Sequence, residues 1–301
     1  MKKTTMLRGY LFVIASAFIF GCMPLMTKYI YAEGINSLSL VFLRNLMSIP
    51  MLGVLAKMQG QSLKVPGKAL FSISLVGIMG CCLTPLLLFS SYNYMASGTA
   101  TVFHFIYPAL AVVGGILFLK ERAKLGTLLC VVICVAGICM FYNPGDPLDW
   151  RGSTLAIVSG ITYAAYILLL SVFPYKDISG FRFSFFISST SSVLLLIACL
   201  VTGQLTLPTT LVGWLLCLGF AFVINVGAVV LFQQGTFLIG GQRAAILSTV
   251  EPITSIFIGA LFLNEAIGVR TAIGSVLVIL ASTLIAVFDM RSAKQETQQE
   301  A

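Results

Sequence analysis

The sequence predicts an all-α integral membrane protein with ten transmembrane helices, arranged as two inverted five-helix repeats. Three observations lead to this fold class. Of the 301 residues, 58% are hydrophobic and only 9% are charged, whereas about a quarter of the residues in a soluble domain are charged. The apolar residues fall into ten runs of spanning length, and the second half of the chain repeats the first. The lipid bilayer is therefore the expected solvent.

Each apolar run has about the 20 residues that a helix needs to cross the hydrocarbon layer. The connectors are short and rich in turn-forming residues, such as EGINS and NPGDP, so none of them is long enough to form a soluble domain. The first five runs are 9–31, 36–57, 68–91, 96–119 and 124–142, and the last five are 152–173, 180–202, 209–232, 241–263 and 267–289.

The N-terminus resembles a cleaved signal in one respect, because basic residues precede an apolar segment that leads to IFGC (19–22). A signal core has about 7–15 apolar residues, whereas this run continues to Tyr31. We therefore expect a retained first helix, with a cleaved signal as the alternative. At the other end, residues 290–301 are polar and are expected to form a disordered cytoplasmic tail.

Lys and Arg in the connectors predict the orientation, because cytoplasmic loops carry an excess of them. With the N-terminus in the cytoplasm, fourteen of these residues face inward and only Lys28, Arg151 and Arg270 face outward. We expect a multi-pass protein of the cell (cytoplasmic) membrane with both termini in the cytoplasm. The same bias explains the formal net charge of +8. Nucleic acid is not an expected partner, because the basic residues form no single face.

The eight cysteines all lie inside apolar runs. Cys130 and Cys134 can share a helix face, but no His or carboxylate joins them. A buried thiol in a helix usually packs as a small apolar side chain. We therefore expect no metal site, no disulfide and no cofactor. The sequence also lacks a phosphate-binding loop, so the expected energy source is a gradient rather than ATP.

The second half of the chain repeats the first half at an offset of 144 residues. ATVFHFIYPALAVVGGILFLKE (100–121) aligns without a gap with AAILSTVEPITSIFIGALFLNE (244–265), and seven of the 22 positions are identical, Pro, Gly and Glu among them. An offset of 143 aligns the beginnings of the halves, for example Gly9 with Gly152. The helices therefore form two copies of one unit.

The two repeats are expected to span residues 9–142 and 152–289. Because each copy has an odd number of helices, the second copy enters the membrane from the opposite face. Inverted repeats are typical of alternating-access transporters, whose substrate site lies near the midplane between the halves. Two copies that point in opposite directions can exchange conformations, and this exchange converts an outward-open state into an inward-open state.

These features resemble the drug/metabolite transporter superfamily, and in particular its EamA-type ten-helix branch. A Pro stands 13 residues before a Glu at the end of both the fourth and the ninth spans, in YPALAVVGGILFLKE (107–121) and EPITSIFIGALFLNE (251–265). The resemblance implies export of small metabolites, amino acids among them. It also implies a cavity lined chiefly by helices 1, 3, 4, 6, 8 and 9. Its motifs do not identify the substrate.

Arg44, His104 and Glu251 are ionisable residues deep inside predicted spans. A charge at the centre of a span costs about 2.5–3.5 kcal/mol on insertion scales, so each should face the protein interior or a wet cavity. Glu251 is a candidate proton or cation site, or a structural carboxylate paired with Arg44. Arg44 is alternatively a ligand for a substrate carboxylate. His104 suits proton coupling, and a neutral His bonded to a neighbouring helix is the alternative.

Pro108 and Pro252 lie at matching depths of the fourth and ninth spans. A proline lacks the backbone N–H that would bond the carbonyl four residues earlier. We therefore expect structural kinks at both positions, with free carbonyls near the membrane centre. Since Glu251 directly precedes Pro252, the pair would form a polar, bent patch where the two halves meet.

Tyrosine and amide side chains complete the expected cavity. Aromatic walls with few charges suit a small amphipathic or weakly charged solute, although packing or an interfacial belt is the alternative for each residue. The predicted substrate-binding set is Arg44, Tyr92, His104, Tyr107, Tyr163, Tyr166, Asn225, Gln233 and Glu251.

The sequence thus predicts a secondary active transporter that exports a small metabolite, with an amino acid as the leading candidate, as a monomer or a homodimer. The expected partners are a small-molecule substrate, membrane lipid and, through Glu251 and His104, the proton. An exporter of organic cations or drugs and a membrane receptor or scaffold without transport are the alternatives. An enzyme is not expected, because three scattered ionisable residues do not form a catalytic cluster.

Overall fold

The computed structural model describes residues 3–95, 97–120, 125–140, 149–173, 178–263, 268–270, 272–281 and 284. Within these ranges all regular structure is helical. The predicted tail, 290–301, and parts of the spans 124–142 and 267–289 lie outside the described residues.

Ten membrane helices can be traced in the described part of the chain, which confirms the predicted fold class. Two of them, Leu125–Cys139 and Ala272–Ala281, are short, and one is divided into α13 (Gly241–Leu247) and α14 (Val250–Leu263). The other seven are long and apolar enough to cross a membrane: Thr4–Ala32, Ser37–Met58, Gly67–Ser91, Ala100–Leu119, Trp150–Ser171, Gly180–Thr202 and Leu211–Ile239.

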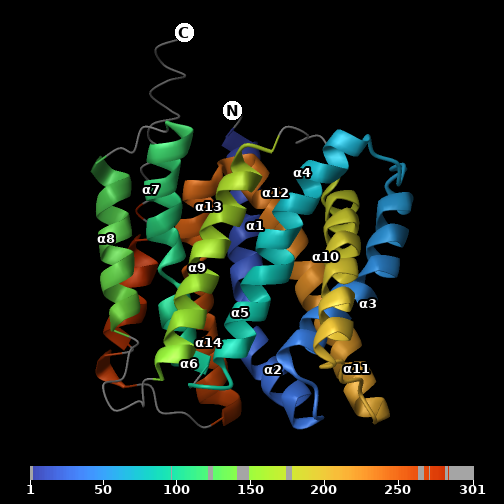
Figure 1. Cartoon of the computed structure of the whole chain (residues 1–301). Coiled ribbons are helices and arrows are strands. Elements are labelled where there is room, and N and C mark those ends of the chain that lie inside the picture. Colours follow the sequence, from blue (N-terminus) through green and yellow to red (C-terminus); the bar gives the residue numbers. More distant parts are fainter. Residues whose placement is uncertain are drawn as a thin grey trace.

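The two halves of the chain enter the helix bundle from opposite edges (Figure 1). In this view, α1 begins at the top edge, whereas α9, the first helix of the second half, begins at the bottom edge. The first half contains α1 (Lys3–Phe20), α2 (Met23–Ala32), α3 (Ser37–Met58), α4 (Gly67–Gly77), η1 (Ile78–Leu83), α5 (Thr84–Ser91), α6 (Ser97–His104), α7 (Tyr107–Leu119) and α8 (Leu125–Cys139). The second half continues with α9 (Trp150–Ser171), α10 (Gly180–Thr202), α11 (Leu211–Phe220), η2 (Ala221–Val229), α12 (Val230–Ile239), α13 and α14.

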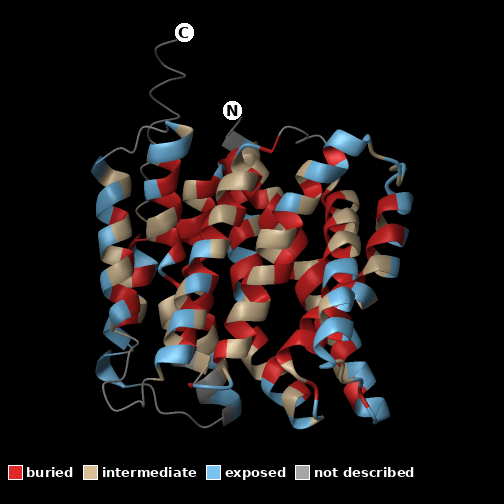
Figure 2. Cartoon of the chain, in the orientation of Figure 1, coloured by how far each residue is buried: buried red, intermediate tan, exposed pale blue. Residues whose placement is uncertain are grey.

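Buried residues lie mainly toward the centre of the bundle, and exposed residues lie mainly on its outside and at its ends (Figure 2). Large apolar side chains are common on the outer surface, and Phe18, for example, is 61% exposed. A surface of this composition suits contact with lipid acyl chains, because burial in hydrocarbon removes the apolar area from water.

The fourth and ninth membrane helices, which share the 13-residue spacing between Pro and Glu, are both interrupted next to the proline. α6 ends at His104 before α7 begins at Tyr107, and α13 ends at Leu247 before α14 begins at Val250. The Ser248 carbonyl is not free, contrary to our expectation, because it accepts a hydrogen bond from the Glu251 backbone N–H (2.9 Å). A tight turn thus supplies the donor that Pro252 cannot.

Two π-helical segments, η1 and η2, lie in the third and eighth membrane helices. Shifting η1 by 144 residues places it on 222–227, inside η2, so the two repeats share this irregularity. The sequence contains no signal that predicts it. π-helical turns are rare and occur often at functional sites.

α3 and α10 pack extensively against each other, toward one side of the bundle (Figure 1). Loop contacts join them at both ends. Asn36, the N-cap of α3, donates to the Gln204 carbonyl beyond α10 (2.6 Å). At the opposite end, Ser179 before α10 donates to Gln59 after α3 (2.5 Å). These contacts hold the helix that carries Arg44 in a fixed position.

Candidate functional site

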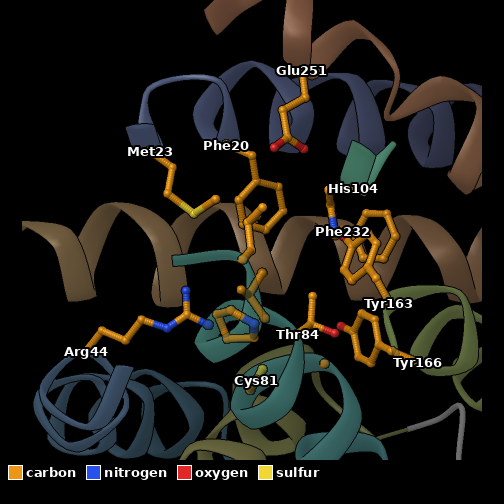
Figure 3. Close-up of a pocket in the computed structure, with 14 residues that line it drawn as sticks. Phe20, Met23, Arg44, Cys81, Thr84, His104, Tyr163, Tyr166, Phe232 and Glu251 are labelled. Carbon is orange, nitrogen blue, oxygen red and sulfur yellow. The ribbon is translucent and has the colours of Figure 1, made fainter. Parts of the chain in front are cut away.

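A cavity with about 520 Å³ of empty space, including the part open at its mouth, is lined by residues from both repeats (Figure 3). The predicted residues Arg44, His104, Tyr163, Tyr166 and Glu251 are all on its wall. The remaining lining residues are Phe20, Met23, Gly80, Cys81, Thr84, Pro85, Leu88, Val229 and Phe232. The lining residues come from the first, third, fourth, sixth, eighth and ninth membrane helices, as the family resemblance implies. Arg44 is added by α3, which is the second membrane helix.

Arg44 lies near the middle of α3 and is only 3% exposed. Its guanidinium carbon is 5.8 Å from the centroid of the Phe89 ring, a cation–π contact. The Arg44 Nε atom has no hydrogen-bond partner among the residues that the structure describes. The guanidinium reaches the cavity, and within the described residues no carboxylate pairs with it, Glu251 included.

Glu251 lies in the first turn of α14 and is 9% exposed. Figure 3 shows its carboxylate pointing into the cavity from the top, while Arg44 enters from the lower left. Gly21, in the turn between α1 and α2, allows this part of α14 to come close, since a Cβ there would lie 2.8 Å from the Glu251 carbonyl oxygen. In the described part of the chain, no cation lies within ion-pair distance of the Glu251 carboxylate.

His104, the last residue of α6, bonds to the neighbouring helix α9. Its Nδ1 atom is 2.8 Å from the Ser159 hydroxyl, which in turn donates to the Ala156 carbonyl (2.6 Å). Because the serine proton is already used, Nδ1 must be the donor, and Nε2 is then the acceptor nitrogen of the neutral ring. His104 is thus a neutral histidine bonded to a neighbouring helix, which was the alternative to a role in proton coupling. The same geometry leaves Nε2 as the nitrogen that can accept a proton.

Aromatic rings form one wall of the cavity. Tyr163 stacks on Tyr166 (5.5 Å between ring centroids) and on Phe232 (5.7 Å). The His104 ring lies 5.4 Å from Tyr163. Ring faces of this kind attract cations as well as apolar groups, so the wall suits an amphipathic or positively charged group.

Most of the cavity wall follows the internal repeat. Phe20 and Tyr163 are 143 residues apart, as are Met23 and Tyr166. Pro85 and Val229 are 144 residues apart, as are Leu88 and Phe232. All eight residues line the cavity, which therefore lies where equivalent parts of the two repeats meet.

Four predicted site residues lie behind the wall instead. The Tyr107 ring packs edge-on against Tyr163 (4.7 Å), and Tyr92 packs against Phe89 (5.9 Å). Gln233 accepts a hydrogen bond from Ser184 (2.6 Å), and Asn225 donates to the Arg44 carbonyl (3.1 Å). All four side chains contact the protein interior, which sequence position alone does not reveal. Within the described residues, the two tyrosine hydroxyls, Gln233 Nε2 and Asn225 Oδ1 have no hydrogen-bond partner.

The apolar residues of the wall were not predicted, because nothing in the sequence distinguishes an apolar side chain that faces a cavity from one that faces lipid. The repeat does offer a signal for two of them. Shifting Tyr163 and Tyr166 back by 143 residues identifies Phe20 and Met23. Within the described residues, no group of three His, Cys, Asp or Glu side chains could hold a metal ion.

A ten-helix bundle of inverted repeats around a cavity between the repeats is the architecture of membrane transporters. The chain matches the EamA-like transporter family twice, over residues 7–143 and 150–287, and it belongs to that family.

Several relatives carry transporter names. The chain is 23% identical to an uncharacterized transporter of Clostridium kluyveri, with 93% of each chain covered, and 24% identical to the uncharacterized inner membrane transporter YicL of Salmonella typhimurium, with 95% and 98% covered. An uncharacterized transporter of Archaeoglobus fulgidus is 31% identical over 166 residues, and this match spans 58% of that relative. A solved crystal structure shares the fold, with a TM-score of 0.77, 15% identity, and 97% of this chain and 99% of that chain covered.

Proposed function

We propose that the protein is a secondary active transporter that exports a small zwitterionic metabolite, an amino acid, by alternating access. The observation that carries this proposal is that Arg44 and Glu251, which have no ion-pair partner among the described residues, reach one cavity from different sides. The rigid units that exchange conformations are repeats 9–142 and 152–289.

Electrostatics favour a ligand with both charges. A buried charge without a partner is costly, and a lone cation or a lone anion would satisfy only one of the two side chains. A zwitterion places its carboxylate on Arg44, which can bind it with two parallel hydrogen bonds. Its ammonium group then faces Glu251 and the rings of His104 and Tyr163.

Glu251 also supplies a route for coupling to the proton. A proton and a substrate ammonium both neutralise the same carboxylate, so they compete for it, and competition at one alternating site produces antiport. His104 Nε2 lies on the same cavity wall and is the second proton site of the proposal.

The proposed location is the cytoplasmic membrane with both termini in the cytoplasm. The excess of Lys and Arg in one set of connectors supports the orientation. The inner membrane named for the Salmonella relative supports the compartment.

Counterflow in proteoliposomes tests the transport proposal. Vesicles loaded with an unlabelled mixture of the common amino acids should accumulate labelled members of that mixture. Decarboxylated amines and N-acetylated acids should compete poorly, because each lacks one of the two charges. Flux that organic cations inhibit equally well would instead favour the organic-cation exporter, and binding without counterflow would favour a receptor.

A further inference from the structure

The two π-helical segments contain equivalent residues with different chemistry. Cys81 in η1 and Asn225 in η2 are 144 residues apart, and both are buried. Cys81 lines the cavity, whereas Asn225 lies behind it against α3.

The side chain of Asn45, on α3, bridges these two equivalent residues. Its Nδ2 atom donates to the Cys81 carbonyl in η1 (3.1 Å), and its Oδ1 atom accepts from Asn225 Nδ2 in η2 (3.3 Å). The second Nδ2 hydrogen goes to the Val41 carbonyl within α3 (2.8 Å). One amide thus joins both irregular segments to α3, and we call this arrangement the Asn45 bridge.

The Asn45 bridge also acts on the residue beside it. Asn225 donates to the Arg44 carbonyl (3.1 Å), so the backbone of Arg44 is held from η2. Asn45 and Arg44 are adjacent, and their side chains point to different sides of α3: the guanidinium faces the cavity and the amide faces the π-helical segments. The Phe89 ring contacts the guanidinium, and the position of the α3 backbone helps to set its direction.

Packing alone does not explain a buried amide at this point. Asn45 is 0% exposed, and an amide removed from water needs hydrogen bonds that an aliphatic side chain of similar size does not need. The network also leaves the Asn225 Oδ1 atom without a hydrogen-bond partner in the described residues, which carries a cost. An apolar residue in place of Asn225 would avoid that cost.

We propose that Asn45 is a positioning residue for the carboxylate of the substrate: by tying η1 and η2 to α3, it holds Arg44 toward the cavity. The inference rests on the proposed function, because it takes a carboxylate as the ligand of Arg44.

The test compares variants of the purified full-length protein. Asn45→Leu removes the donors and the acceptor while keeping the number and branching of the side-chain heavy atoms. Thr236→Val is the matched control, since Thr236 is also buried (1% exposed) and its hydroxyl bonds only within its own helix, to the Phe232 carbonyl (2.8 Å). Two measurements are made on each variant: the binding of L-leucine relative to 3-methylbutylamine, which lacks only the carboxylate, and hydrogen exchange in 78–83 and 221–229.

Asn45→Leu should reduce the preference for leucine over the amine about tenfold, as Arg44→Gln should. The double variant should lose no more than either single variant, because both act on one interaction. Exchange should rise in both π-helical segments. Thr236→Val should keep the preference and the exchange of both segments.

The outcomes separate the two proposals. If Arg44→Gln loses the preference while Asn45→Leu keeps it, or if the two losses add, the inference is overturned and the proposed function stands. If the unmodified protein shows no preference for the carboxylate, both fail. Should Asn45→Leu not fold, Asn225→Ala cuts the bridge from η2 and is judged by the same two measurements.

Discussion

Arg44, His104 and Glu251 interrupt the internal symmetry of the cavity wall. Their equivalents in the other repeat are Ile187, Ser248 and Tyr107, none of which carries a charge at neutral pH. The aromatic and aliphatic part of the wall is nearly two-fold, whereas the charges are not. A ligand held by these charges therefore has one orientation, with its carboxylate toward Arg44.

Arg44→Lys tests the geometry of carboxylate binding. Lysine keeps the positive charge but lacks the planar fork that matches two carboxylate oxygens. We expect affinity for amino acids to fall about tenfold while affinity for the matching amines stays constant. Isothermal titration of both ligand classes measures this. Equal losses for both classes would contradict a specific contact between Arg44 and the carboxylate.

Glu251→Gln tests proton coupling at nearly constant shape. The amide neither gains nor loses a proton near neutral pH, so a pH gradient should no longer drive uphill accumulation in proteoliposomes. The unmodified protein, driven by the same gradient, is the reference. A variant that still responds to the gradient and exchanges substrate at the same rate would show that Glu251 takes no part in coupling.

The residues of the candidate site were predictable where an ionisable side chain stands inside an otherwise apolar span. Arg44, His104 and Glu251 stand out because ionisable groups are expensive inside a membrane protein. Tyr107 and Gln233 could not be separated from Tyr163 and Tyr166, because a polar side chain in a span may serve either a cavity or an internal contact. Only the packing of α7 and α12 against their neighbours decides which.

At the scale of elements, the existence of the membrane helices was predictable and their irregularities were only partly so. Pro108 and Pro252 indicated the breaks before α7 and α14. The π-helical segments had no such signal, since η1 and η2 are made mostly of apolar residues that suit an α-helix equally well. Both segments also form hydrogen bonds with Asn45, which belongs to another helix.

Gly80→Ala tests how closely η1 must approach α9. A Cβ at Gly80 would overlap the Tyr166 ring on the cavity wall. We expect destabilisation of about 1–3 kcal/mol from overpacking, measured as a lower midpoint of thermal unfolding, together with weaker substrate binding as Tyr166 shifts. Gly219→Ala is the control, because its Cβ would meet no atom within 4 Å. An unchanged midpoint for Gly80→Ala would contradict this packing.

For the whole molecule, the inverted arrangement was readable from the sequence because an odd number of helices per copy forces the second copy to reverse. The contacts that join the halves were not. Asn36 with Gln204 and Gln59 with Ser179 connect loops more than a hundred residues apart, and no pattern in the sequence pairs them. Together with the packing of α3 on α10, these contacts join the two repeats.

Alternating access of the cavity is the central claim, and Cys81 permits a direct measurement because it lines the cavity. The other seven cysteines, 22, 82, 130, 134, 139, 199 and 217, are replaced by alanine. A membrane-impermeant maleimide is then applied to right-side-out and to inside-out vesicles. We predict labelling of Cys81 from both sides, slowed by substrate in each case. Labelling from one side alone, with or without substrate, would contradict the account.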